Sequence, residues 1–320
     1  MGRVCRRLAI ISALLLMLGG CQWADEPTKS WQLAKQGIYD ATLSPQGDRI
    51  VIGSIHHGGS LWNTKSFARL YNWNHKEDQF TQILTTAYSS EGGFALTAEL
   101  TRLVLWNANN GKPIWLWRAP SEIYDADLAL DGRFALLGLA DFTAVFFDIR
   151  NGGVLREFEH LGPIRSVDLS RTGRLAITGS EDLSAIVWDV NSGKLKFRFQ
   201  HDNSLRLVKI SDDDRLALTA ANLEKTKIWN LNTGKLHRVL NTGRISLTSA
   251  RFFDNGNKLL LGSTNRLVQL WDVKTGKLLK SWRMPRTGTN KYSSTFILDV
   301  APVSGAYLAV GSDGHLFMLQ

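Results

Sequence analysis

Hydrophobic and polar residues alternate along most of the chain in short runs separated by turn sequences. The clearest set lies within residues 160–193, HLGPIRSVDLSRTGRLAITGSEDLSAIVWDVNSG. Apolar residues alternate with polar ones over 164–169, 175–178 and 184–190, and a fourth run covers 195–199. A period of two predicts β-strands, and the short turns between the runs predict hairpins. The sequence therefore predicts a four-stranded antiparallel sheet for this unit.

The same unit recurs along the chain. Its third run ends in Trp188 followed by Asp, and an aromatic residue followed by Asn or Asp recurs at successive spacings of 44, 41, 41, 41 and 42 residues. A period of 40 to 45 residues with four strands per unit is typical of β-propeller blades. Because a single blade leaves both of its faces exposed, we expect the blades to pack into a ring. The recurring aromatic positions are Trp62, Trp106, Phe147, Trp188, Trp229 and Trp271.

The two ends of the domain are predicted to share its last blade. Residues 30–33, SWQL, are similar to residues 280–283, KSWR, which form the fourth strand of the sixth unit. The sequence stops after the third strand of a seventh unit, so residues 30–33 can supply the missing outer strand and leave no free edge. The expected fold is all-β: a seven-bladed β-propeller over residues 31–320, with the N-terminal strand closing the last blade.

The repeat resembles that of WD-repeat β-propellers over nearly all of the chain after residue 30. The unit at 160–193 matches the family pattern best, including the Trp188-Asp189 pair. In that family a His, a Ser or Thr, an Asp and a Trp form a buried hydrogen-bonded chain that stiffens the blade. The resemblance assigns these roles to His160, Ser180, Asp182 and Trp188.

The other blades depart from the family pattern. The fifth keeps only His201 and Trp229, with Asn222 near the Asp position. None of the remaining blades has the Gly-His pair of the family, so the polar chain is expected to be incomplete there. A partner shared with well-studied members of the family is therefore not implied.

The first 20 residues resemble an export signal. Three arginines precede an apolar run over 8–18, which is too short to remain as a membrane-spanning helix. The run ends in LGGC, which resembles the bacterial lipobox, in which the cysteine, here Cys21, is lipidated and becomes the mature N-terminus. The alternative is a secreted protein with a chance cysteine. We predict a lipoprotein signal peptide over 1–20, and a lipidated cysteine with a short tether over 21–30.

The predicted signal peptide and the residue after Cys21 also indicate the compartment in which the protein is expected. Gln22 is not the Asp that retains lipoproteins in the inner membrane of enteric bacteria, so an outer-membrane anchor facing the periplasm is expected by analogy. Because Cys5 lies in the removed segment, the mature chain has no thiol for a disulfide, a metal or catalysis. It carries 35 basic and 29 acidic residues, a net charge of +6. Export excludes nucleic acid as a target, and the basic balance favours anionic lipid surfaces or acidic partners.

The chain shows no convincing catalytic or metal-binding motif. It lacks a nucleophile elbow, a zinc-binding helix motif and a phosphate-binding loop. His56 and His57 are adjacent, but neighbouring side chains of a strand point to opposite faces and no third ligand is evident. We expect a solvated loop there, and no metal or cofactor.

One set of charged residues is in register on the innermost strands and should form an arc around the central channel. Asp127 and Asp168 could share a proton as a catalytic acid pair. The interpretation we favour is structural, with Asp168 neutralised by Lys209 of the next blade, because a propeller fold by itself implies no activity. The set consists of Asp127, Asp168, Lys209 and Arg251.

A candidate partner-binding surface lies where the innermost strands begin, on the upper face. The tether is expected to attach at the opposite, lower face. Tyr and Arg often carry interface energy, although ordinary surface side chains are an alternative explanation. The loop before the seventh blade adds Arg286, Lys291 and Tyr292 to this side. Aligning the blades places Tyr39, Leu84, Tyr124, Arg165, Arg206 and Thr248 at equivalent positions beside the channel mouth.

Two classes of function fit these observations. The first is a non-catalytic, membrane-anchored scaffold, a monomeric propeller that holds other envelope proteins together. The second is a quinoprotein-type or other ligand-binding propeller, with or without enzymatic activity, or an outer-membrane assembly factor resembling the propeller lipoprotein of the barrel assembly machinery. Such proteins usually have eight blades, whereas this chain has the length for seven.

Overall fold

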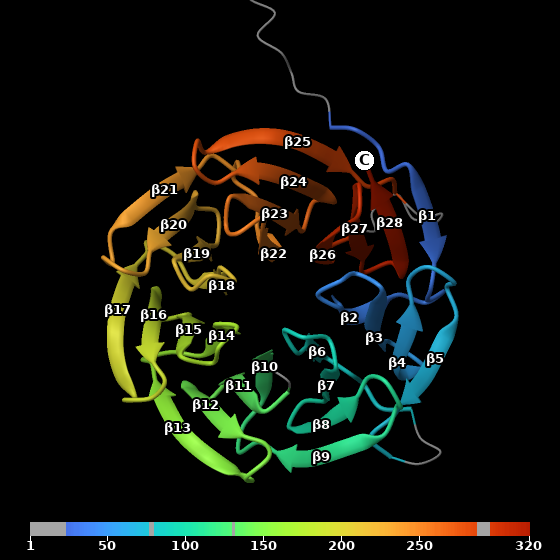
Figure 1. The fold of residues 1–320 in the computed structure, drawn as a ribbon, viewed down its shortest axis with the longest axis horizontal. Helices are drawn as coiled ribbons and strands as arrows, with labels where there is room; N and C mark the ends of the chain where they lie inside the picture. Colours follow the sequence, from blue (N-terminus) through green and yellow to red (C-terminus); the bar gives the residue numbers. More distant parts are fainter. Residues whose placement is uncertain (1–23, 77–79, 130–131, 287–294) are drawn as a thin grey trace, which may run out of the picture.

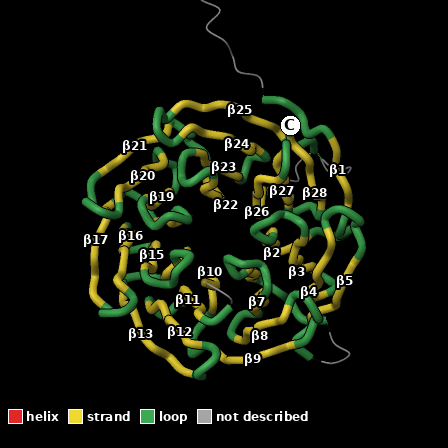
Figure 2. The backbone as a smooth tube through the Cα atoms, in the orientation of Figure 1, coloured by secondary structure: helices red, strands yellow, loops and turns green. Residues whose placement is uncertain are grey.

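The alternating runs form strands, and successive strands pair into seven separate four-stranded antiparallel sheets. The computed structural model describes residues 24–76, 80–129, 132–286 and 295–320. The sheets stand around a central channel like the blades of a propeller (Figure 1). Figure 2 shows that the regular elements of the described chain are strands joined by short loops. The prediction of an all-β, seven-bladed propeller is confirmed.

In each of the first three blades the innermost strand comes first along the chain and the outermost strand last. Blade one contains β2 (Ile38–Leu43), β3 (Arg49–Ser54), β4 (Gly58–Asn63) and β5 (Arg69–Trp73). Blade two contains β6 (Thr85–Tyr88), β7 (Phe94–Ala98), β8 (Arg102–Asn107) and β9 (Pro113–Arg118). Blade three contains β10 (Ile123–Ala129), β11 (Phe134–Leu139), β12 (Thr143–Asp148) and β13 (Gly153–Glu159).

Blades four to six repeat this order, whereas blade seven takes its outer strand from the N-terminal segment. Blade four contains β14 (Ile164–Leu169), β15 (Leu175–Ser180), β16 (Ser184–Asp189) and β17 (Lys194–Gln200). Blade five contains β18 (Leu205–Ile210), β19 (Leu216–Ala221), β20 (Thr226–Asn230) and β21 (Leu236–Leu240). Blade six contains β22 (Leu247–Phe253), β23 (Lys258–Ser263), β24 (Leu267–Asp272) and β25 (Lys277–Arg283). Blade seven contains β26 (Ile297–Val303), β27 (Ala306–Gly311), β28 (His315–Leu319) and β1 (Lys29–Gln32).

The ring closes through the N-terminal strand, as predicted. β1 pairs antiparallel with β28, from Lys29 opposite Met318 to Gln32 opposite His315. The fold begins earlier than residue 31, because Asp25 already forms a parallel bridge with Trp282 of β25. Part of the segment assigned to the tether is therefore an ordered strap that joins blade six to blade seven. In Figure 1 the strap follows the outer rim of the ring.

Adjacent blades pack through apolar side chains and through glycines of the second strands. Gly138 of β11 faces Val167 of β14, and a Cβ added at Gly138 would lie 2.9 Å from Val167 Cγ1. Gly179 of β15 meets Val208 of β18 in the same way, at 2.8 Å. Real Cβ atoms do not approach so closely, so a side chain at either position would push two blades apart.

Carboxylates also join the innermost strands of neighbouring blades. Asp40 accepts a hydrogen bond from the backbone N–H of Thr86 at 2.7 Å, which links blade one to blade two. Asp299 accepts one from Leu43 N at 2.8 Å, which links blade seven to blade one. Such bonds satisfy backbone donors of the inner strands that point between blades. The other carboxylate links of this kind are Asp125 to Val167, Asp127 to Leu169, and Asp168 to Ile210.

Candidate functional site

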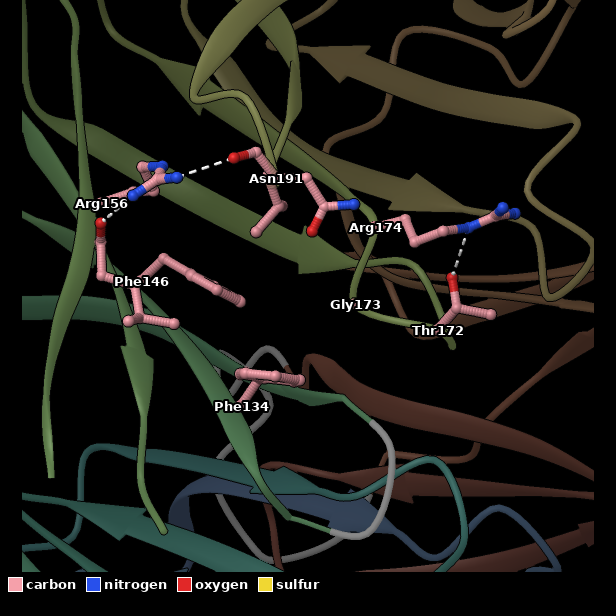
Figure 3. A pocket seen from close by; sticks show the side chains of 9 residues that line it. Phe134, Phe146, Arg156, Thr172, Gly173, Arg174 and Asn191 are labelled. Atoms are coloured by element: carbon pink, nitrogen blue, oxygen red, sulfur yellow. Dashed lines mark hydrogen bonds between the residues drawn. The ribbon is translucent and has the colours of Figure 1, made fainter. Parts of the chain in front are cut away.

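A hollow of about 190 Å³ lies between blades three and four (Figure 3). Phe134 and Phe146, stacked at 5.2 Å, form one wall. Arg156 and Arg174 flank the opening. Arg156 donates to the carbonyl of Asn191 at 2.7 Å, and Arg174 donates to the Thr172 hydroxyl at 3.3 Å. Because both guanidinium groups bond to the protein itself and no described lining residue has a buried polar atom without a partner, we interpret this hollow as a packing seam.

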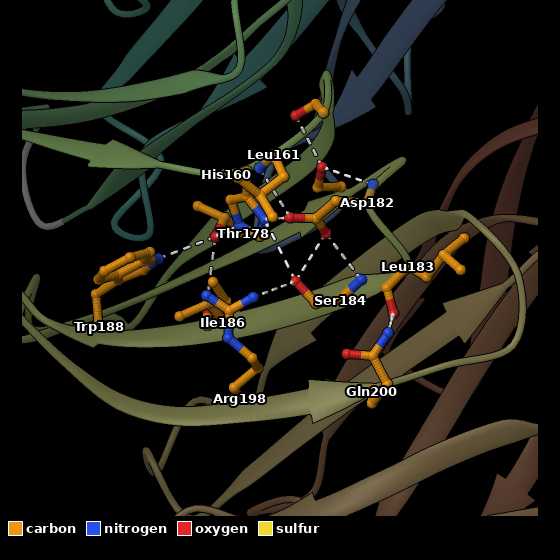
Figure 4. A network of polar contacts seen from close by, with 12 residues as sticks. His160, Leu161, Thr178, Asp182, Leu183, Ser184, Ile186, Trp188, Arg198 and Gln200 are labelled. Carbon is orange, nitrogen blue, oxygen red and sulfur yellow. Dashed lines mark hydrogen bonds and ion pairs between the residues drawn. The ribbon is translucent and has the colours of Figure 1, made fainter.

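A buried polar network runs through blade four (Figure 4). The Trp188 indole donates to Thr178 Oγ1 at 2.9 Å, and Thr178 Oγ1 lies 2.7 Å from His160 Nε2. His160 Nδ1 lies 2.8 Å from Asp182 Oδ2. A neutral ring with its proton on Nδ1 satisfies every contact, and burial lowers the pKa of His160 accordingly. Burial would raise the pKa of Asp182, but hydrogen bonds from the Leu161 N–H and a serine hydroxyl outweigh it and lower that pKa.

The hydroxyl that links the histidine to the tryptophan is Thr178, so the assignment of this role to Ser180 is wrong. Ser180 Oγ instead donates to the carbonyl of Gly162 at 2.8 Å and accepts from the N–H of Asp182 at 3.1 Å. Both residues lie on β15 with their side chains on the same face. Only Thr178 lies level with the rings of His160 and Trp188, whereas Ser180 lies at the turn.

Two further blades have the same network, contrary to the expectation that it is incomplete outside blade four. In blade five the acid is Glu224, which lies 3.1 Å from His201 Nδ1, so Asn222 does not take this role. In blade two the histidine comes from the loop before β6, and its acid is again a glutamate. A threonine nine or ten residues before the tryptophan is the shared signal in the sequence. The complete sets are His75, Thr97, Glu99 and Trp106 in blade two, and His201, Thr219, Glu224 and Trp229 in blade five.

The predicted partner-binding residues share a structural feature that the sequence did not show. The register of the innermost strand shifts around Tyr39, Tyr124, Arg165 and Arg206 in their respective blades. Each of these residues is therefore the extra residue of a β-bulge. A bulge turns a side chain out of the regular alternation, here at the end of the strand beside the channel mouth. Thr248 occupies the same position in blade six, whereas Leu84 precedes β6.

Two of these residues contact each other across the boundary between blades three and four. The Arg165 guanidinium lies 3.8 Å from the centroid of the Tyr124 ring. Arg165 Nε also lies 2.7 Å from Glu181 Oε1. Tyr39 is 40% exposed, and Arg206 is exposed as well. The bulge residues thus offer aromatic and cationic groups to solvent around one rim of the channel.

The loop residues added to this surface are only partly described. Arg286 is exposed on the segment that follows β25. Its positive charge, with that of Arg283, adds to burial in lowering the pKa of Arg266. Arg286 therefore belongs to a second cationic group near the rim of blade six. Lys291 and Tyr292 lie outside the described residues.

The charged arc in the channel is arranged as the structural interpretation predicts. Lys209 Nζ lies 2.5 Å from Asp168 Oδ1, and Arg251 Nη2 lies 2.9 Å from Asp299 Oδ2. Burial would lower the pKa of Lys209, but the carboxylates of Asp168 and Asp127 raise it above its ordinary value. Burial, followed by the charge of Asp168, raises the pKa of Asp127 to about 8. Asp127 is thus largely protonated at neutral pH, beside an ion pair.

The raised pKa of Asp127 predicts that the protein becomes less stable as pH rises from 7.5 to 8.5. In this window the folded state still binds a proton on Asp127 that the unfolded chain has already released. The free energy of unfolding therefore falls as the pH rises. The buried histidines contribute little above pH 7.5, because their lowered pKa values keep them neutral in the folded state and their ordinary pKa of 6.5 leaves them mostly neutral in the unfolded chain. We expect a slope of no more than about 1 kcal/mol per pH unit in urea unfolding. Asp127→Asn should flatten the curve, and an equally steep curve in this variant would contradict the assignment.

The described residues contain no group of three or more His, Cys, Asp or Glu side chains placed to hold a metal ion. His56 and His57 are both exposed on the turn between β3 and β4, and the His57 ring contacts the edge of Phe80. In the described part of the chain no helix is long and apolar enough to cross a membrane.

One repeat of the chain matches the sequence model of a known family. Residues 152–189 match the family model described as WD domain, G-beta repeat. The match starts at the outer strand of blade three and ends with the third strand of blade four, so the sequence repeat is shifted by one strand from the structural blade. The same shift explains why an N-terminal strand completes the last blade.

A comparison with curated proteins finds no match. The class that the fold defines is a seven-bladed β-propeller, and one of its repeats matches the WD-repeat family model.

Proposed function

We propose that this propeller is a non-catalytic scaffold, anchored by a lipid in the bacterial cell envelope, that binds other envelope proteins on its upper face. The observation that carries the proposal is the set of bulge residues around the channel mouth. Arg and Tyr are enriched at interface positions that dominate binding energy. Here Tyr39, Tyr124, Arg165 and Arg206 are turned outward by the same backbone device in four blades.

The rigidity of the blades supports binding at this surface. Three blades have a complete buried network, and each network ends in a carboxylate on the upper side. The turns between second and third strands and the loops before the first strands are held together there. Glu181, which orients Arg165, lies on such a turn next to Asp182. A partner would therefore meet preorganised side chains, which lowers the entropy cost of binding.

The position of the strap supports attachment to a membrane at the rim. Cys21 lies four residues before Asp25, which pairs with β25, so a lipid on Cys21 is at most about 14 Å from this rim. The outer strands of blades four to six carry exposed basic side chains and no acidic residue, which favours an anionic lipid surface. The ring is then held by its edge, and both faces stay accessible. The exposed basic residues are Lys194, Lys196, Arg198, Lys277 and Arg283, together with Lys235 in the turn just before β21.

Partner binding is tested by reversing two charges on the upper face. Arg165→Glu with Arg206→Glu should lower the melting temperature only slightly, because the Arg165–Glu181 pair is partly solvated and Arg206 is exposed. The double variant should abolish the capture of envelope proteins after crosslinking in membranes. Lys112→Glu with Arg118→Glu, on the lower turn and outer strand of blade two, is the matched control and should retain capture. An unchanged set of captured proteins in the Arg165/Arg206 variant would rule out this surface.

Lipid attachment makes a separate prediction. Cys21→Ser should leave the protein unprocessed or release it into the soluble fraction, because no other residue of the mature chain can carry the thioether. The measurement is membrane fractionation together with the intact mass. A Cys21→Ser protein that stays in membranes at its normal mature mass would overturn the anchor, without touching the result for the upper face.

A further inference from the structure

A cavity of about 230 Å³ opens in blade one, under the loop that joins β1 to β2. It occupies the place where three other blades hold their buried polar network. Trp62 lines it, and Trp62 pairs with Ile50 as Trp188 pairs with Ala176 in blade four. Unlike Trp188, Trp62 is only partly buried.

Blade one differs from blade four at three positions of the network, and two of the residues there, Ala34 and Ile52, line the cavity. The alignment of blades one and four places Ala34 at the position of His160, Ile52 at that of Thr178, and His56 at that of Asp182. A methyl group thus replaces the imidazole ring, and an apolar side chain replaces the hydroxyl that joins histidine to tryptophan. The Trp62 indole bonds instead to Ser60 Oγ of its own strand at 2.9 Å.

The cavity contains a buried hydroxyl without a partner among the described residues. Ser54 lines the cavity and is only 4% exposed, and its Oγ makes no hydrogen bond. Its counterpart in blade four, Ser180, makes two. A buried hydroxyl that loses both water and protein partners costs free energy, so a bound molecule with a polar atom would be stabilised there.

The remaining lining defines the chemistry of such a molecule. Lys35, His57 and Arg69 are basic and exposed, and no acidic residue lines the cavity. Arg69 Nη1 donates to Asn72 Oδ1 at 3.2 Å, which leaves the other N–H groups of this guanidinium for an anion. The guanidinium lies 4.8 Å from the centre of the Trp62 ring, so an anion bound by Arg69 would also touch an aromatic surface. Leu33 completes an apolar wall.

We propose that blade one binds a small carboxylate with a planar or aliphatic body, held by Arg69 and the Ser54 hydroxyl against Trp62. The size agrees with this class. A protein cavity of about 150 Å³ is known to hold benzene, so about 230 Å³ has room for a ring together with a carboxylate. The site is independent of the upper-face surface and of the anchor.

Benzoate is the probe for this test, and benzamide is its neutral control. With ¹⁵N-labelled tryptophan the full chain gives up to eleven indole signals, and Trp62→Phe identifies the one from Trp62. Benzoate should shift this signal saturably, with a dissociation constant on the order of a millimolar or tighter. Benzamide should bind at least about tenfold more weakly, because it lacks the charge. No saturable shift, or equal affinity for both compounds, would overturn the proposal.

Two variants locate the site. Arg69→Gln should weaken benzoate binding about tenfold, whereas Arg118→Gln on the neighbouring outer strand should leave it unchanged. Ala34→His with Ile52→Thr and His56→Asp rebuilds the blade-four network in the cavity, and should abolish binding while raising the melting temperature. If this triple variant does not fold, the pair of arginine variants decides, and equal binding by both would refute the site.

Discussion

Trp188→Ala is expected to lower the free energy of unfolding by about 3 to 5 kcal/mol. The side chain is 8% exposed and stacks on Phe158, with ring centroids 4.8 Å apart. Its loss leaves a cavity between blades three and four and removes the indole that donates to Thr178. Thr178 and His160 keep their mutual bond, so most of the cost comes from lost packing.

The measurement is urea unfolding followed by circular dichroism, with Phe80→Ala as the aromatic control. Phe80 is 70% exposed, so its truncation should change stability by less than about 0.5 kcal/mol. Equal effects of the two substitutions would mean that Trp188 does not occupy the core position the repeat assigns to it.

Lys209→Met is expected to destabilise the protein by about 2 to 4 kcal/mol, the second largest effect. The substitution leaves the carboxylate of Asp168, whose side chain is 8% exposed, without its cation at the channel wall. Asp127, which is largely protonated at neutral pH, supplies no positive charge that could replace the lysine. The partial exposure of Lys209 keeps the cost below that of a fully buried pair.

The double variant Asp168→Asn with Lys209→Met separates charge from packing. An asparagine oxygen can still accept the bond from the Ile210 N–H, and no net charge is left unpaired. The double variant should therefore recover most of the stability that Lys209→Met loses. If the two variants are equally unstable, the ion pair is not what the lysine contributes.

The periodic part of the fold could be predicted from the sequence because it rests on local signals. Alternation and turns define each hairpin, and Trp188 with its equivalents fixes the period. Closure by residues near Trp31 followed from their similarity to β25. The bonds from Asp40 and Asp299 to neighbouring blades could not be predicted, since they join residues that become neighbours only when the ring closes.

The polar networks show where resemblance to a family misleads. His75 was missed because it lies ten residues before β6, whereas His160 lies four before β14. Glu99 and Glu224 were missed because the family pattern has aspartate at this position, and a longer side chain reaches the histidine equally well. The bulges at Tyr124 and Arg165 depend on backbone register, which a single sequence does not encode visibly.

Photo-crosslinking from the upper face in intact membranes tests the scaffold proposal most directly. A photoreactive residue in place of Arg206, at the bulge of β18, would be compared with one in place of Lys112, on the lower turn of blade two. We predict covalent adducts with envelope proteins from position 206 and none from position 112. Adducts from position 112 with none from position 206 would contradict the account.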